Sequence, residues 1–392
     1  MTIHDALITT QVKLDEATSQ LATADMIAID TEFMRDKTYF SQLCLIQIAG
    51  GGYHYAIDPI NTDLDFTSFY DLLQNEAIIK VFHAARQDIE IFHILTGKVP
   101  KPLFDSQIAA MVCGLGDQIG YDKLVQHYLG LQIDKSSRFT DWSKRPLSAK
   151  QLHYALDDVI HLEKIYPLLK AELERNQREG WIEAEMAILR DEQTYIIDPN
   201  EVYKRIKIRS PKPKILNRLR ALAAFREIEC RKRDLPRGRF LKDETLIDLA
   251  ASGPQTYNAL SKIRGLQISE TSWLTKKLIS LIKDADEVDK DSWPVMAKKA
   301  PTERPPTAVL EMLRVLLKTV CDELGVASRV IASASDLERL ALSDDGDQPV
   351  LQGWRYEVFG KQALEMKAGK IAITLQDNQI CFHPISDLPL KE

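Results

Sequence analysis

Short apolar runs and helical segments alternate over the N-terminal half of the chain. The apolar runs predict strands at residues 26–33, 43–50, 52–58 and 78–84, with Gly50-Gly51-Gly52 as the turn between the second and third. Apolar residues at helical spacing predict helices at residues 67–75, 87–97, 106–114, 121–130 and 149–175, and Pro167 is a candidate kink in the last. A meander followed by alternating strands and helices is typical of a mixed sheet with helices on its faces.

The pattern changes near residue 203, where strand signals stop and helical periodicity takes over. This change marks a domain boundary, and Ser210-Pro211-Lys212-Pro213 is an expected linker. A second break, at residues 290–306, is too rich in proline and charge to be one regular element. We therefore divide the chain into residues 1–203, residues 204–290, a linker at 291–306, residues 307–375 and a C-terminal tail at 376–392.

The two helical stretches look like diverged copies of one unit, displaced by 91 residues. Apolar positions of the first stretch fall on apolar positions of the second: Leu219, Leu222, Cys230, Leu246, Leu249 and Ala250 on Leu310, Leu313, Cys321, Leu337, Leu340 and Ala341. Chance matches between two helical segments are the alternative explanation.

Acidic side chains follow the predicted strands and one predicted helix. Asp30 and Glu32 end the first strand, and their spacing points both toward one face of the sheet. Asp88 lies in the first turn of a helix, where the helix dipole alone would favour an acid. Tyr154 and Asp158 share a helix face at i and i+4. Taken singly, each acid could be a solvated surface group.

Taken together, these residues fit a particular chemistry. Hard divalent cations such as Mg²⁺ take oxygen ligands. Two such cations about 3.5–4 Å apart can hold both the attacking and the leaving oxygen of a phosphodiester. A phenol beside them can hold the nucleophilic water, although an ordinary pKa near 10 makes it a poor base. Four carboxylates with one tyrosine are therefore typical of phosphodiester hydrolysis.

The motifs Asp30-Thr-Glu32, Asp88 and Tyr154-x-x-x-Asp158 resemble those of the DEDD exonuclease superfamily, in its tyrosine-containing branch. The flanking segments Asp30–Arg35, Pro102–Gln107 and Thr140–Leu147 are similar to ribonuclease D more than to polymerase proofreading domains. The resemblance implies an α/β ribonuclease H-like exonuclease domain, with a mixed sheet flanked by helices. Both helical stretches resemble the helicase-and-ribonuclease-D C-terminal (HRDC) module, the first more clearly, so two small all-α domains are expected to follow.

The resemblance also implies an activity and a role for each motif residue. It implies a metal-dependent 3′→5′ exoribonuclease that releases nucleoside 5′-monophosphates, with tRNA precursors that carry 3′ extensions and other structured RNAs as substrates. Two divalent cations, Mg²⁺ or Mn²⁺, are the expected cofactors. Asp30 would bridge both cations, Glu32 and Asp158 would complete one site and Asp88 the other, and Tyr154 would align the attacking water.

Other residues are candidates for contacts with the substrate. Lys135 falls where related exonucleases place a lysine near the terminal phosphate, with an exposed loop lysine as the alternative. Phe33 either stacks on a base or fills the core. The net charge of −6 conceals a basic run, because residues 204–239 contain fourteen Lys or Arg against three Asp or Glu. We expect this run to follow RNA phosphates, with a solvated face as the alternative, and assign substrate contacts to Arg231, Lys232, Arg237 and Arg239.

Several features are expected to be structural or to set the cellular context. We interpret His83 and His161 as ordinary fold residues, Trp142 as structural, and Asp105 as a capping or orienting group. Five scattered cysteines are typical of reduced thiols. The N-terminus has no signal-peptide pattern, and no apolar stretch approaches the roughly 18 residues of a spanning helix, so we expect a cytoplasmic monomer without membrane contact.

Two other functions are consistent with parts of the sequence. A 3′→5′ DNA exonuclease on the same fold is the alternative enzyme, because the motifs say little about the 2′-hydroxyl group. A nucleic-acid-binding scaffold with vestigial acids is the alternative from another class, and the complete set of acids argues against it. A helicase is disfavoured because the sequence has no Gly-x-x-x-x-Gly-Lys-[Ser/Thr] loop.

Overall fold

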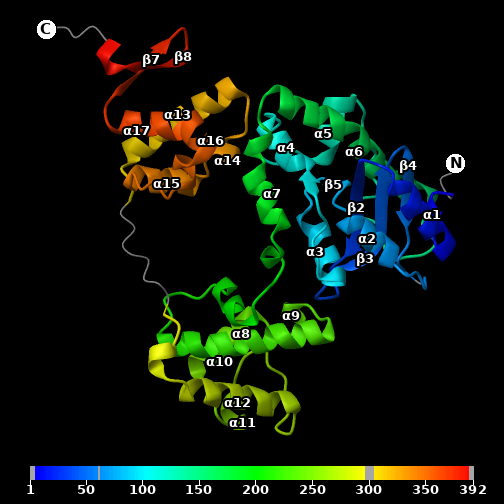
Figure 1. The fold of residues 1–392 in the computed structure, drawn as a ribbon. Coiled ribbons are helices and arrows are strands. Elements are labelled where there is room, and N and C mark those ends of the chain that lie inside the picture. Colours follow the sequence, from blue (N-terminus) through cyan, green and yellow to red (C-terminus); the bar gives the residue numbers. More distant parts are fainter. Residues whose placement is uncertain (1–4, 61, 296–303, 388–392) are drawn as a thin grey trace.

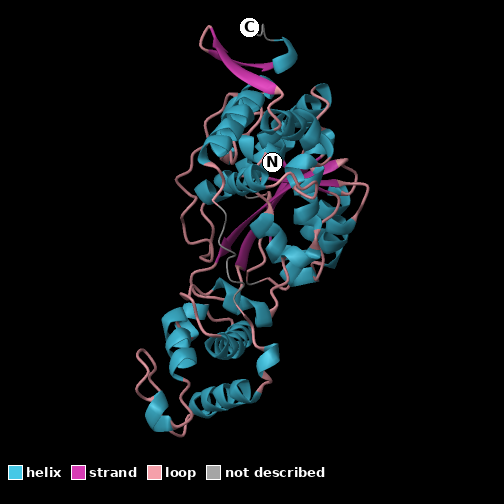
Figure 2. Ribbon diagram, turned by 90° about the vertical axis from the view of Figure 1, so that its left-hand side faces the viewer, coloured by secondary structure: helices cyan, strands magenta, loops and turns pink. Residues whose placement is uncertain are grey.

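The structure is a computed structural model that describes residues 5–60, 62–295 and 304–387. The chain forms three parts (Figure 1): an α/β domain on the right of the view, a first helical module below it and a second module at the upper left. Figure 2 shows strands in the α/β domain and in a hairpin near the C-terminal end, whereas the lower module is helical.

A six-stranded mixed sheet forms the centre of the α/β domain, in the order β1–β4–β3–β2–β5–β6. β3 runs antiparallel to both of its neighbours, and the other pairs are parallel. The strands are β1 (Leu7–Ile8), β2 (Met26–Met34), β3 (Gln42–Gly50), β4 (Tyr53–Ile57), β5 (Ile79–Phe82) and β6 (Leu103–Asp105). The predicted mixed sheet is confirmed. β1 and β6 were missed because two and three residues are too few to show an alternation.

The two faces of the sheet bury alternate residues of β2. Ile27 and Ile29 share one core with helices α1 to α3, and Ala28 packs on the opposite face against α6. Asp30 therefore faces α6 as well, because side chains alternate along a strand. The helices of this domain are α1 (Gln11–Leu21), α2 (Thr67–Gln74), α3 (Arg86–Thr96), α4 (Ser106–Val112), α5 (Tyr121–Leu129), α6 (Ala149–Arg175) and α7 (Glu183–Arg190). The range predicted for α6 is confirmed, and this helix continues through Pro167.

The predicted glycine turn joins β3 to β4. Gly51 and Gly52 have φ angles of +60° and +84°, a conformation that residues with a Cβ rarely adopt. Positive φ at both central residues is the geometry of two-residue hairpin loops. A Cβ on Gly50 would lie only 2.7 Å from the carbonyl oxygen of Met26. Glycine is thus required for the turn and also for the close approach to β2.

The first module has its own apolar core. Its helices are α8 (Pro213–Arg233), α9 (Arg237–Phe240), α10 (Asp243–Ser252), α11 (Tyr257–Leu260) and α12 (Trp273–Glu287). The 3₁₀ segment Pro199–Arg205 packs against α8, and Val202 is buried in the same core as Leu219 and Leu246. The core of this module therefore begins slightly before the boundary that we expected at residue 204.

The second module repeats the first at the predicted displacement. α14 (Ser328–Ile331) follows α9 by 91 residues at both ends, and α15 (Ala334–Leu342) begins 91 residues after α10. The six paired apolar positions are buried in both copies. The remaining helices are α13 (Thr307–Leu324), α16 (Gly353–Arg355) and α17 (Lys361–Lys367), with a π-helical turn at Tyr356–Gly360. A chance match of leucines does not account for this agreement between helix positions.

The end of the second module differs from the prediction. β7 (Ile371–Gln376) and β8 (Gln379–Pro384) form an antiparallel hairpin. The expected boundary between residues 375 and 376 cuts through this hairpin, so the all-helical module and the separate tail were wrong. The sequence signal for this hairpin is the pair Asp377-Asn378. Both residues have positive φ, and such pairs close tight hairpins. Residues 388–392 of the tail and residues 296–303 of the linker lie outside the described residues.

The first module contacts the α/β domain through the corner between α8 and α9. Oδ1 of Asp234 accepts hydrogen bonds from the backbone N–H groups of Tyr39 and Phe40, at 3.0 Å each. Next to this corner, the buried carboxylate of Glu227 accepts a hydrogen bond from the Tyr39 hydroxyl. The same carboxylate accepts charged hydrogen bonds from Arg231 and Arg237. The β2–β3 loop is therefore tied directly to the first module.

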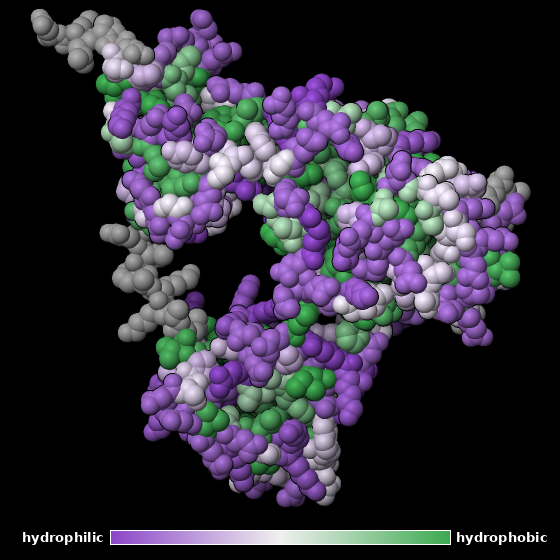
Figure 3. All heavy atoms as spheres, in the orientation of Figure 1, coloured by the Kyte–Doolittle hydropathy of each residue, from purple (hydrophilic) through white to green (hydrophobic). Residues whose placement is uncertain are grey.

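The second module uses the equivalent corner, between α13 and α14, at another place on the α/β domain. The N–H of Ala327 donates to the carbonyl oxygen of Met111 at 3.1 Å. Trp354 stacks on Trp181 with ring centroids 4.2 Å apart and planes 4° apart. Figure 3 shows the molecule in the orientation of Figure 1. Most side chains on the surface that faces the viewer are hydrophilic, and an open space separates the two modules. Each module is thus fixed to the α/β domain by its own contacts.

Candidate active site

The strand β2 supplies two carboxylates at the centre of the sheet. Asp30 pairs with Gln47 and Glu32 with Leu45 of β3, and a β-bulge follows between Glu32 and Phe33. Bulges of this kind redirect the end of a strand and its side chains. Asp30 and Glu32 both line one cavity of about 440 Å³, as their spacing on a strand predicts.

The helix α6 brings Tyr154 and Asp158 to the same cavity. A capping box fixes its first turn: the Ser148 hydroxyl accepts a hydrogen bond from the Gln151 N–H at 3.2 Å, and the Gln151 side chain accepts one from the Ser148 N–H at 3.0 Å. The Tyr154 ring packs against Trp142, which is buried as expected, with centroids 6.1 Å apart. Tyr154 is therefore held by packing against the loop that precedes its own helix.

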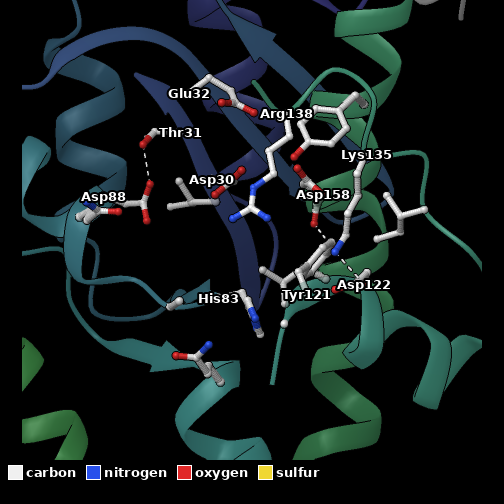
Figure 4. Close-up of a pocket in the computed structure, with 18 of the residues that line it drawn as sticks. Asp30, Thr31, Glu32, His83, Asp88, Tyr121, Asp122, Lys135, Arg138 and Asp158 are labelled. Atoms are coloured by element: carbon white, nitrogen blue, oxygen red, sulfur yellow. Dashed lines mark hydrogen bonds and ion pairs between the residues drawn. The ribbon is translucent and has the colours of Figure 1, made fainter. Parts of the chain in front are cut away.

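Asp88 reaches the cavity from α3, on the opposite side of Asp30 from Asp158 (Figure 4). Its buried carboxylate accepts a hydrogen bond from the Thr31 hydroxyl. The preceding turn is strained, because Ala84 has a φ of +59°. Asp105 holds this turn by accepting hydrogen bonds from the N–H groups of Ala84 and Ala85, at 3.1 and 2.9 Å. The orienting role that we expected for Asp105 is confirmed.

Three of the four predicted metal ligands form one compact group. Single carboxylate oxygens of Asp30, Glu32 and Asp158 lie within 4.8 Å of one another. Asp88 lines the same cavity but lies outside that group. The arrangement therefore offers a three-carboxylate site, with a fourth carboxylate beside Asp30.

Burial shifts the carboxyl groups of this cavity toward their protonated forms. Burial raises the pKa of Asp30 to about 6, and burial together with the charges of Asp30, Asp158 and Asp88 raises that of Glu32 to about 9. Burial, followed by the charge of Asp30, also raises the pKa values of Asp88 and Asp158. Acids that repel one another in this way are stabilised by a cation among them. The all-oxygen donor set fits a hard divalent cation.

The cavity also contains both side chains that we expected to meet substrate here. Lys135 lines it and forms an ion pair with Asp122, with Nζ and Oδ2 2.7 Å apart. Phe33 lines it and is half-buried, which leaves part of its ring accessible. Sequence reasoning missed other lining residues: Gln87, Gln107, Tyr121, Arg138 and Phe139. For Arg138 and Phe139 a signal existed, namely their place between Lys135 and the segment Thr140–Leu147.

The four cations that we assigned to substrate in the basic run do not line this cavity. Arg231 and Arg237 form ion pairs with Glu227 and hydrogen bonds to Tyr39 at the contact of the first module, so part of their donor capacity is already used and their assignment to substrate stays a prediction. The charge pattern could not show this, because the buried acid that binds them is recognisable only in the fold. Lys232 and Arg239 are exposed and remain predicted RNA contacts.

The fold also divides the rest of the basic run. Seven of its fourteen cations form ion pairs: Lys204, Lys214, Arg218, Arg226, Arg231, Arg233 and Arg237. Four exposed cations without an ion pair among the described residues lie together in the segment 205–212: Arg205, Lys207, Arg209 and Lys212. The expected phosphate contacts are therefore concentrated in this shorter segment.

Further residues singled out in the sequence can be placed. The His83 ring contacts Ser106 Oγ at 3.0 Å and the Ile119 carbonyl oxygen at 3.1 Å, and it also lines the acid cavity, so its role as a fold residue stays a prediction. The five cysteines are free thiols. Among the described helices, none combines the length and apolar character that crossing a membrane requires.

Comparison with known proteins agrees with this site. Residues 6–174 match the 3′-5′ exonuclease family, and residues 215–282 match the HRDC domain family. Ribonuclease D of Bartonella henselae is 44% identical over 376 residues, covering 95% of this chain and 93% of that protein. Ribonuclease D of Zymomonas mobilis is 45% identical over 388 residues, covering 97% and 98%. The fold also matches the crystal structure of Escherichia coli RNase D, which is described as an exoribonuclease involved in structured RNA processing. The TM-score is 0.78 at 27% identity, and the match covers 93% of this chain and 98% of that one. The chain belongs to the ribonuclease D family of 3′→5′ exoribonucleases.

Proposed function

We propose that the chain removes single nucleotides from the 3′ end of RNA as nucleoside 5′-monophosphates, with two divalent cations, Mg²⁺ or Mn²⁺, as cofactors. The observation that carries this proposal is the group formed by Asp30, Glu32 and Asp158, with Tyr154 one helical turn from Asp158 in the same cavity. A half-buried group of mutually repelling carboxylates that lines a cavity suits divalent cations that hold a phosphodiester.

The four carboxylates would hold the two cations in different ways. Asp30 lies between the other acids and would hold both cations, Glu32 and Asp158 would complete one site, and Asp88 would complete the other. Bound divalent cations lower the pKa of a coordinated water and neutralise charge that develops on the phosphate. The carboxyl groups must release their protons before they can act as ligands, because their pKa values are raised.

Tyr154 contributes orientation. Burial and then the charges of Asp158, Glu32 and Asp30 raise the pKa of its hydroxyl, so the phenol stays protonated at neutral pH. The Tyr154 phenol is therefore a poor base. Its Oη can still donate one hydrogen bond and accept another, which suffices to hold the attacking water in line with the scissile bond.

Matched RNA and DNA oligomers, each labelled at the 5′ or at the 3′ end, test the proposal when they are incubated with the purified chain and Mg²⁺ or Mn²⁺. We expect the 3′ label of RNA to be released as a nucleoside 5′-monophosphate while the 5′-labelled strand shortens stepwise. Equal or faster cleavage of DNA would identify a DNA exonuclease. Binding of RNA without hydrolysis under either cation would identify a scaffold.

We also propose that the substrates are structured RNAs with 3′ extensions, such as tRNA precursors. The likeness to Escherichia coli RNase D over nearly the full chain supports this substrate class. A tRNA with a short 3′ extension should be trimmed to the end of its stem and then resist further cleavage. We expect a cytoplasmic monomer, which light scattering of the purified protein and fractionation of cells would check.

A further inference from the structure

The loop between α5 and α6 carries two side chains that reach the acid cavity and have no role in the proposal above. Arg138 and Phe139 both line that cavity. The loop is ordered by its own hydrogen bonds, from the Arg138 N–H to the Lys135 carbonyl oxygen at 3.1 Å and from the Thr140 N–H to that of Ser137 at 3.1 Å. The Gln151 amide of α6 donates to Thr140 Oγ1 at 3.2 Å. The loop is thus anchored to the helix that bears Tyr154 and Asp158.

Phe139 is unusually exposed for an aromatic residue. Its relative exposure is 91%, higher than that of every other large hydrophobic side chain in the described parts of the chain. A phenyl ring left in water costs free energy in proportion to its apolar area. The ring lies at the edge of a cavity whose acids suit phosphodiester cleavage, so a nucleic-acid base is the expected partner of the ring.

Arg138 faces the acids and keeps its donors available. Figure 4 shows its side chain extending toward them. Burial raises the pKa values of Glu32, Tyr154 and Asp158, and the charge of Arg138 opposes the rise at all three. Yet its guanidinium makes no hydrogen bond or ion pair with any residue that the structure describes, and lies 5.2 Å from the centroid of the Phe139 ring. A planar fork of five donors beside a phosphodiester-cleaving site suits a phosphate oxygen.

We propose that Arg138 and Phe139 form one subsite for the 3′ end of RNA, in which Arg138 donates to a non-bridging oxygen of the scissile phosphate and Phe139 stacks on the base of the penultimate nucleotide. This proposal rests on the function proposed above. The penultimate base is chosen because the terminal nucleotide must enter the cavity past the exposed ring. Stacking on an aromatic ring is tolerant of base identity, which suits an enzyme that removes nucleotides one after another.

The alternative role for Arg138 is that of a counter-ion, which only relieves repulsion among the acids. The two roles predict different responses of the Arg138→Ala variant to added Mg²⁺. If Arg138 is only a counter-ion, Arg138→Ala would change the Mg²⁺ concentration required and would regain full kcat once the metal is saturating. If it contacts the phosphate, kcat stays low at saturating metal, by about 10²-fold for loss of one donor to the reacting group.

The experiment compares Phe139→Ala, Phe139→Trp, Arg138→Ala and Arg138→Lys in the full-length chain on single-stranded RNA. Phe139→Ala should raise KM about ten-fold or more with kcat little changed, and Phe139→Trp should restore KM. Arg138→Lys should recover part of kcat, because it keeps the charge and loses the planar fork. Val12→Ala and Arg314→Ala are matched controls, since both are exposed side chains outside the cavity.

A second readout does not need hydrolysis. RNA with 2-aminopurine at its penultimate position and a phosphorothioate at its last linkage should lose fluorescence on binding the wild-type chain and Phe139→Trp, and keep it with Phe139→Ala. An unchanged melting temperature of Phe139→Ala would show that the fold is intact, as expected for a ring that is 91% exposed.

The outcomes separate this proposal from the proposed function. Wild-type KM and wild-type quenching in Phe139→Ala would overturn the stacking role, and full kcat of Arg138→Ala at saturating metal would overturn the phosphate contact. Both results leave RNA hydrolysis by the wild-type chain untouched. If the wild-type chain fails to hydrolyse RNA, the proposed function is wrong, while the fluorescence assay still decides whether the subsite binds the 3′ end.

Discussion

Single residues decide whether this cavity can hold a cation at all. In addition to burial, the charge of Asp30 raises the pKa values of Glu32, Asp88 and Asp158, and Asp88 is the acid that α3 supplies. Asp88 is buried and Asp30 is half-buried, and both line the cavity. The predictions for these residues therefore concern chemistry, with the fold unchanged.

Asp30→Asn and Asp88→Asn should each abolish hydrolysis and leave RNA binding largely intact. Loss of a ligand weakens a metal site whose charge stabilisation supplies several kcal/mol, which corresponds to about 10³-fold or more in rate. Single-turnover hydrolysis and equilibrium RNA binding measure the two properties. Asp157→Asn is the matched control, because this neighbouring acid does not line the cavity. Retention of more than about a tenth of wild-type activity in both variants would contradict the assigned ligands.

Tyr154→Phe should lower kcat on the order of 10²-fold with little change in KM. The ring keeps its packing against Trp142, whereas the hydroxyl that orients the water is gone. Steady-state kinetics on RNA separate the two parameters. A raised KM at unchanged kcat would show that Tyr154 binds substrate and does not orient the water.

The metal-free protein should become less stable as the pH rises from about 5 to about 9. The folded-state pKa values of Asp30 and Glu32, about 6 and about 9, lie above their ordinary values of 3.8 and 4.5. The folded state therefore binds these protons more tightly than the unfolded state, and this contribution is present at low pH and lost as the pH rises through 6 and then 9. Melting temperatures in a chelator across this range test the sign.

Two cavity variants, one control variant and added Mg²⁺ make that test specific. Asp30→Asn and Glu32→Gln should each flatten the decline, and Asp134→Asn should leave it unchanged because Asp134 is an exposed acid that does not line the cavity. Added Mg²⁺ should restore the melting temperature most strongly at high pH, where the ligands are deprotonated. A flat profile for the wild-type chain would show that the acids do not repel one another in the folded state.

At the scale of elements, the cations predicted to contact RNA lie mainly in a shorter segment than the sequence indicated. Half of the basic run between residues 204 and 239 is bound to acids, and the free cations gather in the segment 205–212 between the α/β domain and α8. A phosphate track needs unpaired cations, since an ion-paired arginine must first give up its partner. We therefore predict that this segment makes phosphate contacts in addition to those predicted for Lys232 and Arg239.

Replacing Arg205, Lys207, Arg209 and Lys212 by glutamine should weaken RNA binding and reduce its salt dependence. Each phosphate contact on a single strand contributes roughly 0.7 to the slope of log K against log[salt], so four lost contacts reduce the slope by about 2.8. Binding curves at several salt concentrations give the slope. The control replaces four exposed lysines of the α/β domain, Lys13, Lys98, Lys164 and Lys170. Equal slopes for the wild-type chain and the 205–212 variant would show that the segment is merely a solvated surface.

At the scale of the whole molecule, one buried acid, Glu227, lies at the contact between the first module and the α/β domain. The Glu227 side chain is only 1% exposed and receives hydrogen bonds from Tyr39, Arg231 and Arg237. Burial alone would raise its pKa, but hydrogen bonds from Arg237, Tyr39 and Arg231 outweigh burial and lower the pKa to about 2. A group of this kind strongly stabilises a contact when it is paired and is costly when it is not.

Glu227→Ala should therefore lower stability by about 3 kcal/mol, the lower end of the range for breaking a buried ion pair, because both arginines are partly exposed. Denaturant unfolding measures this loss, and limited proteolysis should show earlier release of the first module. Glu229→Ala, which breaks an exposed pair on the same helix, is the matched control. If both variants unfold at the same denaturant concentration, Glu227 does not hold the module.

The sequence by itself determined the local features of this protein. The period-2 alternation of β2 and the i, i+4 spacing on α6 fixed the directions of Asp30, Glu32, Tyr154 and Asp158, since both periodicities are properties of the backbone. The repeat of 91 residues also followed from sequence, because equivalent helices bury equivalent apolar positions. Local geometry is enough for such inferences.

Tertiary structure alone decided which charges are available and which side chains meet. In the sequence Arg231 and Arg237 appear as free cations, whereas in the fold a buried carboxylate pairs with both. The place of Arg138 between Lys135 and the segment Thr140–Leu147 was only a weak signal, and its approach to the acids depends on how the α5–α6 loop folds back onto α6. Pairing between residues far apart in the chain, such as Tyr39 with Glu227, leaves no periodic trace in sequence, because it depends on the packing of separate domains.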